Sequence, residues 1–251
     1  MQHDKLKIEL VSLIKMNLSF FTLKYLSLYN MTYHPGVLDT NRKTNRGRSL
    51  NTPYINIPES LDWRDYGVVG PVHKQGGCNA CWAFSAAGSI EYHVRRKIKD
   101  SEVSVQNIID CSPKTYGCEG GLMEHVFEYK KAFPIIYSYS GTKGKCDASK
   151  QGAHVESFVA IEENIENSLP YMITKWGPVS VGVDFSNLMG YRGGIIEKKS
   201  CGNDANHAVL IVGFTPDVWI VKNSAGTDWG NDGYALMRRG ENACAVDNTY
   251  A

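Results

Sequence analysis

The sequence predicts an α+β protein with two lobes. In its first half apolar residues recur every four positions, which is typical of helices, and beyond residue 155 they alternate, which is typical of strands. With 251 residues, of which 43% are hydrophobic and 21% charged, the chain is long enough for two lobes with apolar cores. Two unlike lobes are expected to meet along a cleft, where binding sites commonly lie.

The clearest helix begins at Cys81. Its apolar stripe comprises Trp82, Ala86, Ile90, Val94 and Ile98. Glu91 and His93 fall on the opposite, solvent-facing side of the expected helix. Shorter helices are predicted after Ser104 (SVQNIIDC) and from Leu122 to about Lys131.

Four segments of the second half are predicted strands. They are VSVGVDF (179–185), HAVLIVGF (207–214), VWIVKNS (218–224) and GYALMRR (233–239). The composition also changes near residue 56, so the expected division is an N-terminal leader or propeptide remnant (1–56), a mostly helical lobe (57–165) and a mostly β lobe (166–251). Within the first part, residues 18–28 resemble the apolar core of a signal peptide, interrupted by Lys24.

Two function classes find no support in the composition. The net charge of +1 leaves no basic footprint for nucleic acid, and no run of 18 apolar residues predicts a membrane span.

Cysteines carry the first functional signal. There are seven, and two of them, Cys78 and Cys81, lie three apart in QGGCNACWAF. This pair is compatible with zinc binding, a redox dithiol, or a disulfide half beside a nucleophile. Zinc needs two further ligands at suitable spacing, and a redox dithiol needs a thioredoxin-like βαβ setting, which the sequence lacks. Cys81 stands at the start of a predicted helix, where the helix dipole favours a thiolate.

A reactive thiolate needs a base, and the base needs an orienting partner. His207 begins one predicted strand and Asn223 lies at the end of the next. The 16 residues between them fit a strand–turn–strand unit that brings both ends together.

Six short sequence motifs together resemble those of a known protein family. QGGCNACWAFSAAGSIE, YGCEGG, GPVSVGV, YRGGI, NHAVLIVGF and NSAGTDWGNDGY occur in the order and spacing of the papain-like cysteine proteases, the cathepsin group included. The likeness covers residues 57–251. It implies the two-lobed papain-like fold, with a helical lobe around the Cys81 helix, a β-barrel-like lobe bearing His207 and Asn223, and the active-site cleft between them.

The resemblance also assigns roles to single residues. Cys81 corresponds to the nucleophile, His207 to its proton partner, Asn223 to the residue that orients the imidazole, and Gln75 to an oxyanion donor. The implied disulfides are Cys78–Cys118, Cys111–Cys146 and Cys201–Cys244, which leaves Cys81 free. The implied substrate-binding residues are Gly120, Gly121, Leu122, Met123, Gly182, Ala208 and Trp229.

The function implied is peptide-bond hydrolysis through an acyl-enzyme, by an endopeptidase that favours an apolar residue two before the scissile bond. No metal or cofactor is implied. The expected partners are peptide or protein substrates and cystatin-like inhibitors, and the expected protein is a monomeric, lysosomal or extracellular enzyme made as a zymogen.

Three features depart from the family pattern. Ala225 stands where the family has a tryptophan that covers the Asn–His hydrogen bond, so that bond is expected to be wetter and activity lower. Asn79-Ala80 replaces Gly-Ser beside the substrate path, and residues 1–56 are shorter than the family's propeptide. The alternative function is therefore a catalytically impaired homologue that binds peptides or proteins.

Overall fold

The computed structural model describes residues 56–129, 133, 138–147, 149, 152–156, 158–161 and 165–248. It also describes the backbone of two short antiparallel strands, β1 (Asn17–Leu18) and β2 (Phe21–Thr22). The rest of the predicted leader or propeptide remnant, the predicted helix end at Lys131 and residues 249–251 lie outside the described residues.

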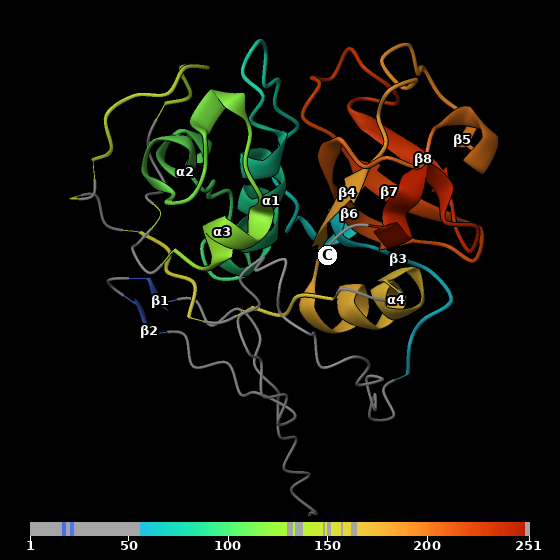
Figure 1. Cartoon of the computed structure of the whole chain (residues 1–251). Helices are drawn as coiled ribbons and strands as arrows, with labels where there is room; N and C mark the ends of the chain where they lie inside the picture. The colour runs from blue at the N-terminus through green and yellow to red at the C-terminus, as the bar shows by residue number, and fades with distance from the viewer. Residues whose placement is uncertain are drawn as a thin grey trace, which may run out of the picture.

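The described chain has a helical part and a sheet part side by side (Figure 1). The helical part holds α1 (Cys81–Arg95), α2 (Val105–Cys111) and α3 (Met123–Phe127). Buried apolar residues form one large cluster around these helices and another beneath the sheet. This is the predicted α+β class; the lobe limits given above stay a prediction.

The long helix α1 is buried more completely than its sequence predicts. The expected stripe is buried at Trp82, Ala86, Ile90 and Val94. The helix ends at Arg95, however, so Ile98 lies beyond it and is 37% exposed, and its assignment to the stripe was wrong. Glu91 was also wrongly expected to face solvent: α1 packs against β6 as well as against helices, and Glu91 is buried, where its Oε1 accepts the Val103 N–H at 3.1 Å.

Small residues let α1 lie close to the sheet part. Ser85 Oγ donates to the Val209 carbonyl at 2.7 Å, and Ser89 Oγ donates to the Pro178 carbonyl at 2.8 Å. A Cβ on Gly88 would lie 2.6 Å from a methyl carbon of Leu210, so a larger residue there would require the Leu210 side chain to shift. These contacts fix the first residue of α1 relative to the strands.

The shorter helices follow the sequence in part. The predicted helix after Ser104 is confirmed as α2, and the Ser104 hydroxyl caps it by accepting the Asn107 N–H at 3.0 Å. The third helix was predicted too long. It ends at Phe127, because the Tyr129 N–H bonds to the Val126 carbonyl three residues back and closes the last turn.

The main sheet contains all four predicted strands and two short additional ones. Its strands are β3 (Leu61–Asp62), β4 (Val179–Val183), β5 (Ile195–Ile196), β6 (His207–Phe214), β7 (Val218–Lys222) and β8 (Tyr234–Arg238). The order is β3-β6-β7-β8-β5, with β4 also paired to β6. Every pair is antiparallel except β5 with β8.

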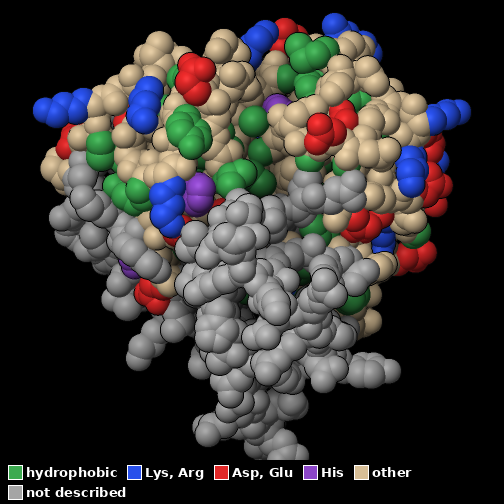
Figure 2. Space-filling model, viewed as in Figure 1, with side chains coloured by type: hydrophobic (Ala, Val, Ile, Leu, Met, Phe, Trp, Pro, Cys, Tyr) green, Lys and Arg blue, Asp and Glu red, His purple; other side chains and the backbone are tan. Residues whose placement is uncertain are grey.

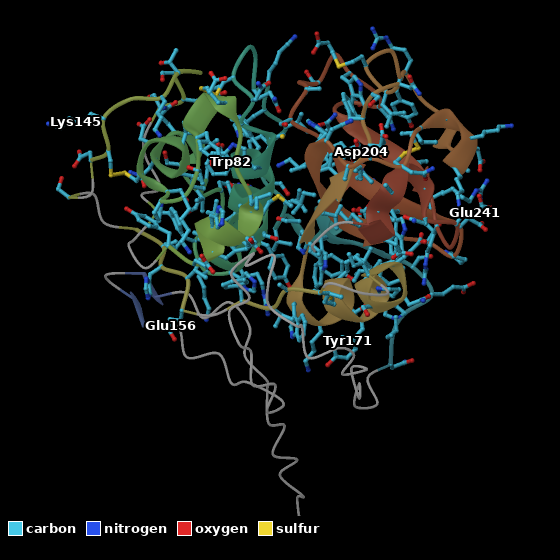
Figure 3. The ribbon with its side chains drawn as sticks, viewed as in Figure 1. Trp82, Lys145, Glu156, Tyr171, Asp204 and Glu241 are labelled. Atoms are coloured by element: carbon cyan, nitrogen blue, oxygen red, sulfur yellow. A yellow bond between two sulfur atoms is a disulfide. The ribbon has the colours of Figure 1, made fainter. Side chains whose placement is uncertain are left out.

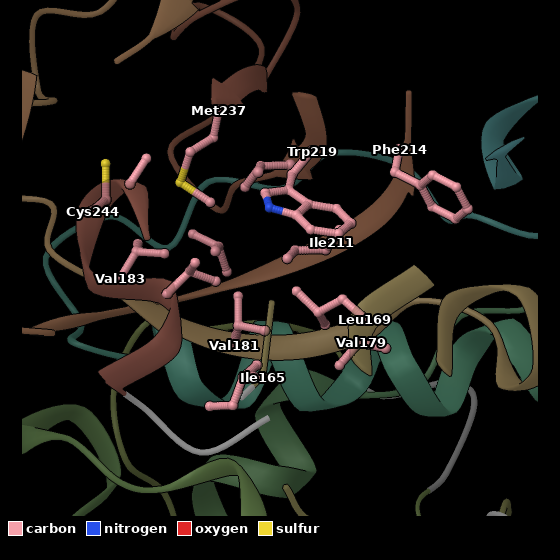
Figure 4. Packing of buried hydrophobic residues seen from close by; sticks show 14 of the residues in the cluster. Ile165, Leu169, Val179, Val181, Val183, Ile211, Phe214, Trp219, Met237 and Cys244 are labelled. Carbon is pink, nitrogen blue, oxygen red and sulfur yellow. The ribbon is translucent and has the colours of Figure 1, made fainter. Parts of the chain in front are cut away.

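The helix α4 (Ile165–Trp176) was not predicted, because only strands were expected beyond residue 155. Ile165, Leu169 and Ile173 recur every four residues and are all buried. Figure 4 shows Ile165 and Leu169 beside β4 residues and below Trp219, within the cluster beneath the sheet. A helical stripe within the β half therefore supplies one side of this core.

Three short 3-10 helices, Trp63–Tyr66, Gly117–Glu119 and Lys198–Ser200, and a kinked 3-10 segment, Ala243–Asn248, complete the described elements. Within the described ranges, no helix has the length and apolar character needed to cross a membrane.

Candidate active site

The thiol of Cys81 lies at the first residue of α1 and is half-buried. Burial raises the pKa of this thiol, but the side-chain hydrogen bond to His207 and the charge of that imidazole lower it, with the Ala208 and Trp82 N–H groups adding to the effect. The net pKa is below that of an ordinary thiol. Cys81 therefore carries thiolate character at a lower pH than a free cysteine.

His207 is the first residue of β6, opposite Val183 of β4. Its Nε2 lies 2.8 Å from Asn223 Oδ1. Because an amide oxygen only accepts, the network assigns the Nε2 proton to this bond and directs Nδ1 toward Cys81. Burial lowers the pKa of His207, but the hydrogen bond and charge of Cys81, together with Asn223, raise it above its ordinary value overall.

Asn223 follows β7 directly and is 4% exposed. Strands β6 and β7 are antiparallel, with Leu210 opposite Lys222, so the start of one lies near the end of the other. Asn223 Oδ1 also accepts the Ser224 N–H at 2.8 Å, which fixes the side chain. This is the meeting of strand ends that the 16-residue spacing predicts.

Gln75 is held between the loop before α1 and Ser224 by two contacts of its amide. Its Nε2 donates to the Cys78 carbonyl at 3.1 Å, and its Oε1 accepts the Ser224 hydroxyl at 2.6 Å. The Gln75 N–H also bonds to the Ser224 carbonyl at 2.8 Å. The sequence reasoning missed Ser224, although its place directly after Asn223 was the available signal.

The three disulfides are the pairs implied by the resemblance: Cys78–Cys118, Cys111–Cys146 and Cys201–Cys244. Cys81 is the free cysteine. Since Cys78 is bonded to Cys118, the Cys-x-x-Cys pair is neither a dithiol nor a pair of zinc ligands. Instead the bridge anchors the loop before α1, where the Asn79 N–H bonds to the Cys118 carbonyl at 2.9 Å.

A cavity of about 610 Å³ opens beside Cys81 and His207. Of the predicted substrate-binding residues, Gly121, Leu122, Met123, Gly182 and Ala208 line it. Phe127 and Phe158 also line it and were missed, because only the chain path places them there. Figure 2 shows hydrophobic side chains in the hollow between the two halves. Trp82 and Asp204 both line the cavity, and Figure 3 shows Trp82 in the helical part and Asp204 in the sheet part.

Two predicted glycines have definite backbone or steric requirements. A Cβ on Gly121 would lie 2.7 Å from the Trp82 ring, so the cavity wall there admits only glycine. Gly120 has φ 123°, a conformation that L side chains rarely adopt, and it is not among the residues that line the cavity.

Trp229 is also outside the cavity lining, and it lies behind His207. The Phe185 ring lies between them, with its centroid 4.4 Å from that of His207 and 5.6 Å from that of Trp229. Sequence reasoning missed Phe185, which comes two residues after β4.

The site is thus a thiol, an imidazole and an amide joined in series, with the thiol and the imidazole lining a cavity between a helix and a sheet. This Cys–His–Asn arrangement is one of the convergent nucleophile–base–orienter sites of covalent catalysis.

Comparison with known proteins places the chain in a family. The model of the papain family of cysteine proteases matches residues 57–251. The chain belongs to that family.

Similar curated proteins are cathepsins. The chain is 38% identical to cathepsin K of Mus musculus over 76% of its length and 63% of that protein's, and 38% identical to cathepsin L of Sarcophaga peregrina over 75% and 61%. The chain therefore spans less than two thirds of the length of these curated relatives.

Solved structures agree on the fold. A cysteine protease of Carica candamarcensis in complex with E-64 has a TM-score of 0.70 at 33% identity, covering 77% of this chain and 96% of that one. The digestive procathepsin L2 of Tenebrio molitor has a TM-score of 0.73 at 36% identity, covering 80% and 69%. The papain-like fold expected from the sequence is thereby confirmed.

Proposed function

We propose that this chain is a cysteine endopeptidase that hydrolyses peptide bonds through Cys81, His207 and Asn223. The observation that carries the proposal is the hydrogen-bond series from the Cys81 thiol through His207 to Asn223 at the edge of the cavity. Its pKa directions favour a thiolate beside an imidazolium.

The first half of the reaction forms an acyl-enzyme. The Cys81 sulfur attacks the substrate carbonyl carbon, and the carbonyl electrons move onto oxygen. The Gln75 amide and the Cys81 N–H, which has no partner within its own helix, donate hydrogen bonds to that oxyanion. His207 gives its proton to the amide nitrogen as the C–N bond breaks, and a thioester on Cys81 remains.

The second half restores the enzyme. Neutral His207 takes a proton from water, and the resulting hydroxide attacks the thioester carbon. The C–S bond then breaks, which releases the new carboxyl group and returns the thiolate–imidazolium pair. Asn223 stays neutral throughout and keeps the imidazole plane aligned.

The cavity supports a preference for an apolar residue two before the scissile bond. Its walls include Leu122, Met123, Phe127 and Phe158, while Glu124 and Asp204 also line it. The compartment proposed is lysosomal or extracellular, since three disulfides fit an oxidising environment. Monomeric state and cystatin-like inhibitors remain part of the proposal.

One experiment tests the activity directly. The full chain is treated at neutral pH with E-64, an epoxide electrophile, and hydrolysis of a fluorogenic peptide is followed beside intact-mass analysis. One label on Cys81 with matching loss of hydrolysis is expected, and Cys81→Ala is the control. Failure of the folded protein to take the label would overturn the proposal. Labelling without any hydrolysis would favour the impaired, peptide-binding alternative that Ala225 suggested.

A further inference from the structure

The ring of Phe185 lies against the ring of His207. Their centroids are 4.4 Å apart and their planes 32° apart. The sheet register produces this contact, because Val183 of β4 pairs with His207 of β6 and Phe185 follows two residues later. The side chain that meets the proposed proton carrier therefore comes from the loop after the neighbouring strand β4.

The backbone of Phe185 is fixed by the residue that precedes His207. Asn206 Oδ1 accepts the Phe185 N–H at 3.0 Å, and Asn206 Nδ2 donates to Ser186 Oγ at 2.8 Å. The Asp184 carboxylate accepts the N–H groups of Ser186 and Asp204, each at 3.0 Å. The loop after β4 is thus tied to the approach to β6 from both sides.

The ring is also supported from behind. Trp229 lies against Phe185, and Tyr191 lies 5.3 Å from Trp229 between ring centroids. The Trp229 indole N–H donates to the Leu188 carbonyl at 2.9 Å, and Tyr191 Oη donates to the Gly194 carbonyl at 2.6 Å. We call this set of rings the aromatic series: Tyr191, Trp229, Phe185 and His207. Its two inner members, Trp229 and Phe185, are held by hydrogen bonds or packing.

Ala225 lies two residues after Asn223 and offers only a methyl group to the same apolar cluster. The expectation from this residue alone is an exposed His207–Asn223 hydrogen bond. The position of Phe185 changes that expectation, because a large apolar ring already covers the imidazole.

We propose that Phe185 is a positioning residue for His207: it holds the plane of the imidazole and keeps water from the His207–Asn223 hydrogen bond, a role that Ala225 is too small to fill. This inference rests on the proposed function. A hydrogen bond in a dry environment is stronger than one that competes with solvent, and aromatic pairs restrict ring rotation.

The neighbours of His207 indicate how the loss of Phe185 should change its titration. The groups that shift its pKa are Cys81 on α1 and Asn223 after β7, besides burial. Asp204 lines the same cavity as His207, and Asp184 accepts the backbone N–H groups of Ser186 and Asp204. If the imidazole of His207 is held less firmly, the main effect should therefore be weaker coupling between His207 and Cys81.

The first measurement is kcat/KM of the full chain and its Phe185→Ala variant on a fluorogenic peptide with an apolar residue two before the scissile bond. Phe185→Ala is expected to lower kcat about tenfold with KM little changed. Phe185→Leu keeps apolar bulk and should lose less. Met189→Ala, a substitution of a residue that is 72% exposed on the same loop, is the control and should match the parent.

The second measurement is the pH profile of kcat/KM. The profile is expected to be bell-shaped, with limits set by the pKa values of Cys81 and His207. In Phe185→Ala, weaker coupling between these two groups raises the pKa of Cys81 and lowers that of His207. The active pH range should therefore become narrower at both ends. If Phe185 had only a structural role, its loss would lower kcat/KM at every pH without narrowing the active pH range, and that result would overturn the inference.

The third measurement asks whether positions 185 and 225 share one role. Ala225→Trp should restore most of the lost activity in the Phe185→Ala background, yet change the parent less than twofold. Equal effects in both backgrounds would overturn the inference. If the parent hydrolyses peptides and Phe185→Ala is unchanged, only this inference fails. If the folded parent neither hydrolyses peptides nor takes the E-64 label, the proposed function fails.

Discussion

Cys81 comes from the helical part and His207 from the sheet, and the two are held by different kinds of contact. Cys81 is the first residue of a 15-residue helix and follows the disulfide-bonded Cys78 by three residues. His207 depends on strand β4, on Asn223 from the end of β7 and on the ring of Phe185. The thiol is thus set by the start of a helix beside a disulfide, and the imidazole by the ends of neighbouring strands and an aromatic ring.

The departures from the family pattern show the same asymmetry. On the thiol side, Asn79 is exposed and its backbone N–H still bonds to Cys118. On the imidazole side, Ala225 removes a large side chain and Phe185 occupies the face of the ring. Under the proposed function, a change on the thiol side should alter the substrate path, whereas a change on the imidazole side should need a second residue to offset it.

Removing the nucleophile is expected to have the largest effect. Cys81→Ala should lower kcat/KM by at least about 10³-fold, because no other group can form the thioester. Alanine suits the first residue of a helix, so the free energy of unfolding should stay within about 1 kcal/mol of the parent. Steady-state kinetics and urea unfolding check both statements. Residual hydrolysis above a few per cent of the parent, in protein free of contaminating protease, would contradict the account.

Removing the oxyanion donor comes next. Gln75→Ala should lower kcat by about 10²–10³-fold with little change in KM, because its amide acts on charge that develops during the reaction. Lys74→Ala is a suitable control, since Lys74 pairs with Asp228 on the exposed surface. Kinetics in which KM rises while kcat is retained would assign Gln75 to substrate binding instead.

The disulfides allow a matched test of the two sides. Opening Cys78–Cys118 or Cys201–Cys244 by paired serine substitutions should each cost about 3 kcal/mol of stability, because their loops span 40 and 43 residues. Only the first pair should also lower kcat of the folded protein, about tenfold or more, because the Cys78 carbonyl holds Gln75. Thermal unfolding and kinetics below the melting temperature separate these effects. Equal losses of kcat in both variants would mean that neither bridge acts locally.

The smallest effect is expected at Ser224. Ser224→Ala removes the hydroxyl that bonds to Gln75 Oε1, while the bond from Gln75 Nε2 to Cys78 remains. A loss of about three- to tenfold in kcat is expected. Because Ser224 acts through Gln75, the same substitution should have no further effect in Gln75→Ala. Additive losses would show that Ser224 has a separate role.

These comparisons also explain what the sequence can and cannot predict. The α1 helix, the four main strands and the meeting of His207 with Asn223 follow from periodicity and spacing, because each depends on a continuous segment or on adjacent strands. The motif blocks predicted the roles of Cys81 and Gln75, and these roles stay predictions. Helix α4 and the burial of Glu91 were missed, because each depends on which surface packs against the segment.

Phe185 shows the limit most clearly. Nothing in VSVGVDF distinguishes it from a residue at the end of a strand, and only the pairing of β4 with β6 brings it to His207. Phe127 and Phe158 are similar, because they meet at the cavity only after the helical part has folded. Contacts between distant segments decide these positions, and local patterns do not encode them.

The central claim is that Cys81 and His207 form a thiolate–imidazolium pair. The Cys81 pKa is lowered and the His207 pKa is raised, and both directions favour this pair over the neutral thiol and imidazole. The most direct test is the pH dependence of Cys81 alkylation by iodoacetamide in the parent and in His207→Ala. The parent should react well below the ordinary thiol pKa of about 8.5, and His207→Ala should move the rise in rate up toward that value. A parent profile that rises only near pH 8.5 and is unchanged in His207→Ala would contradict the account.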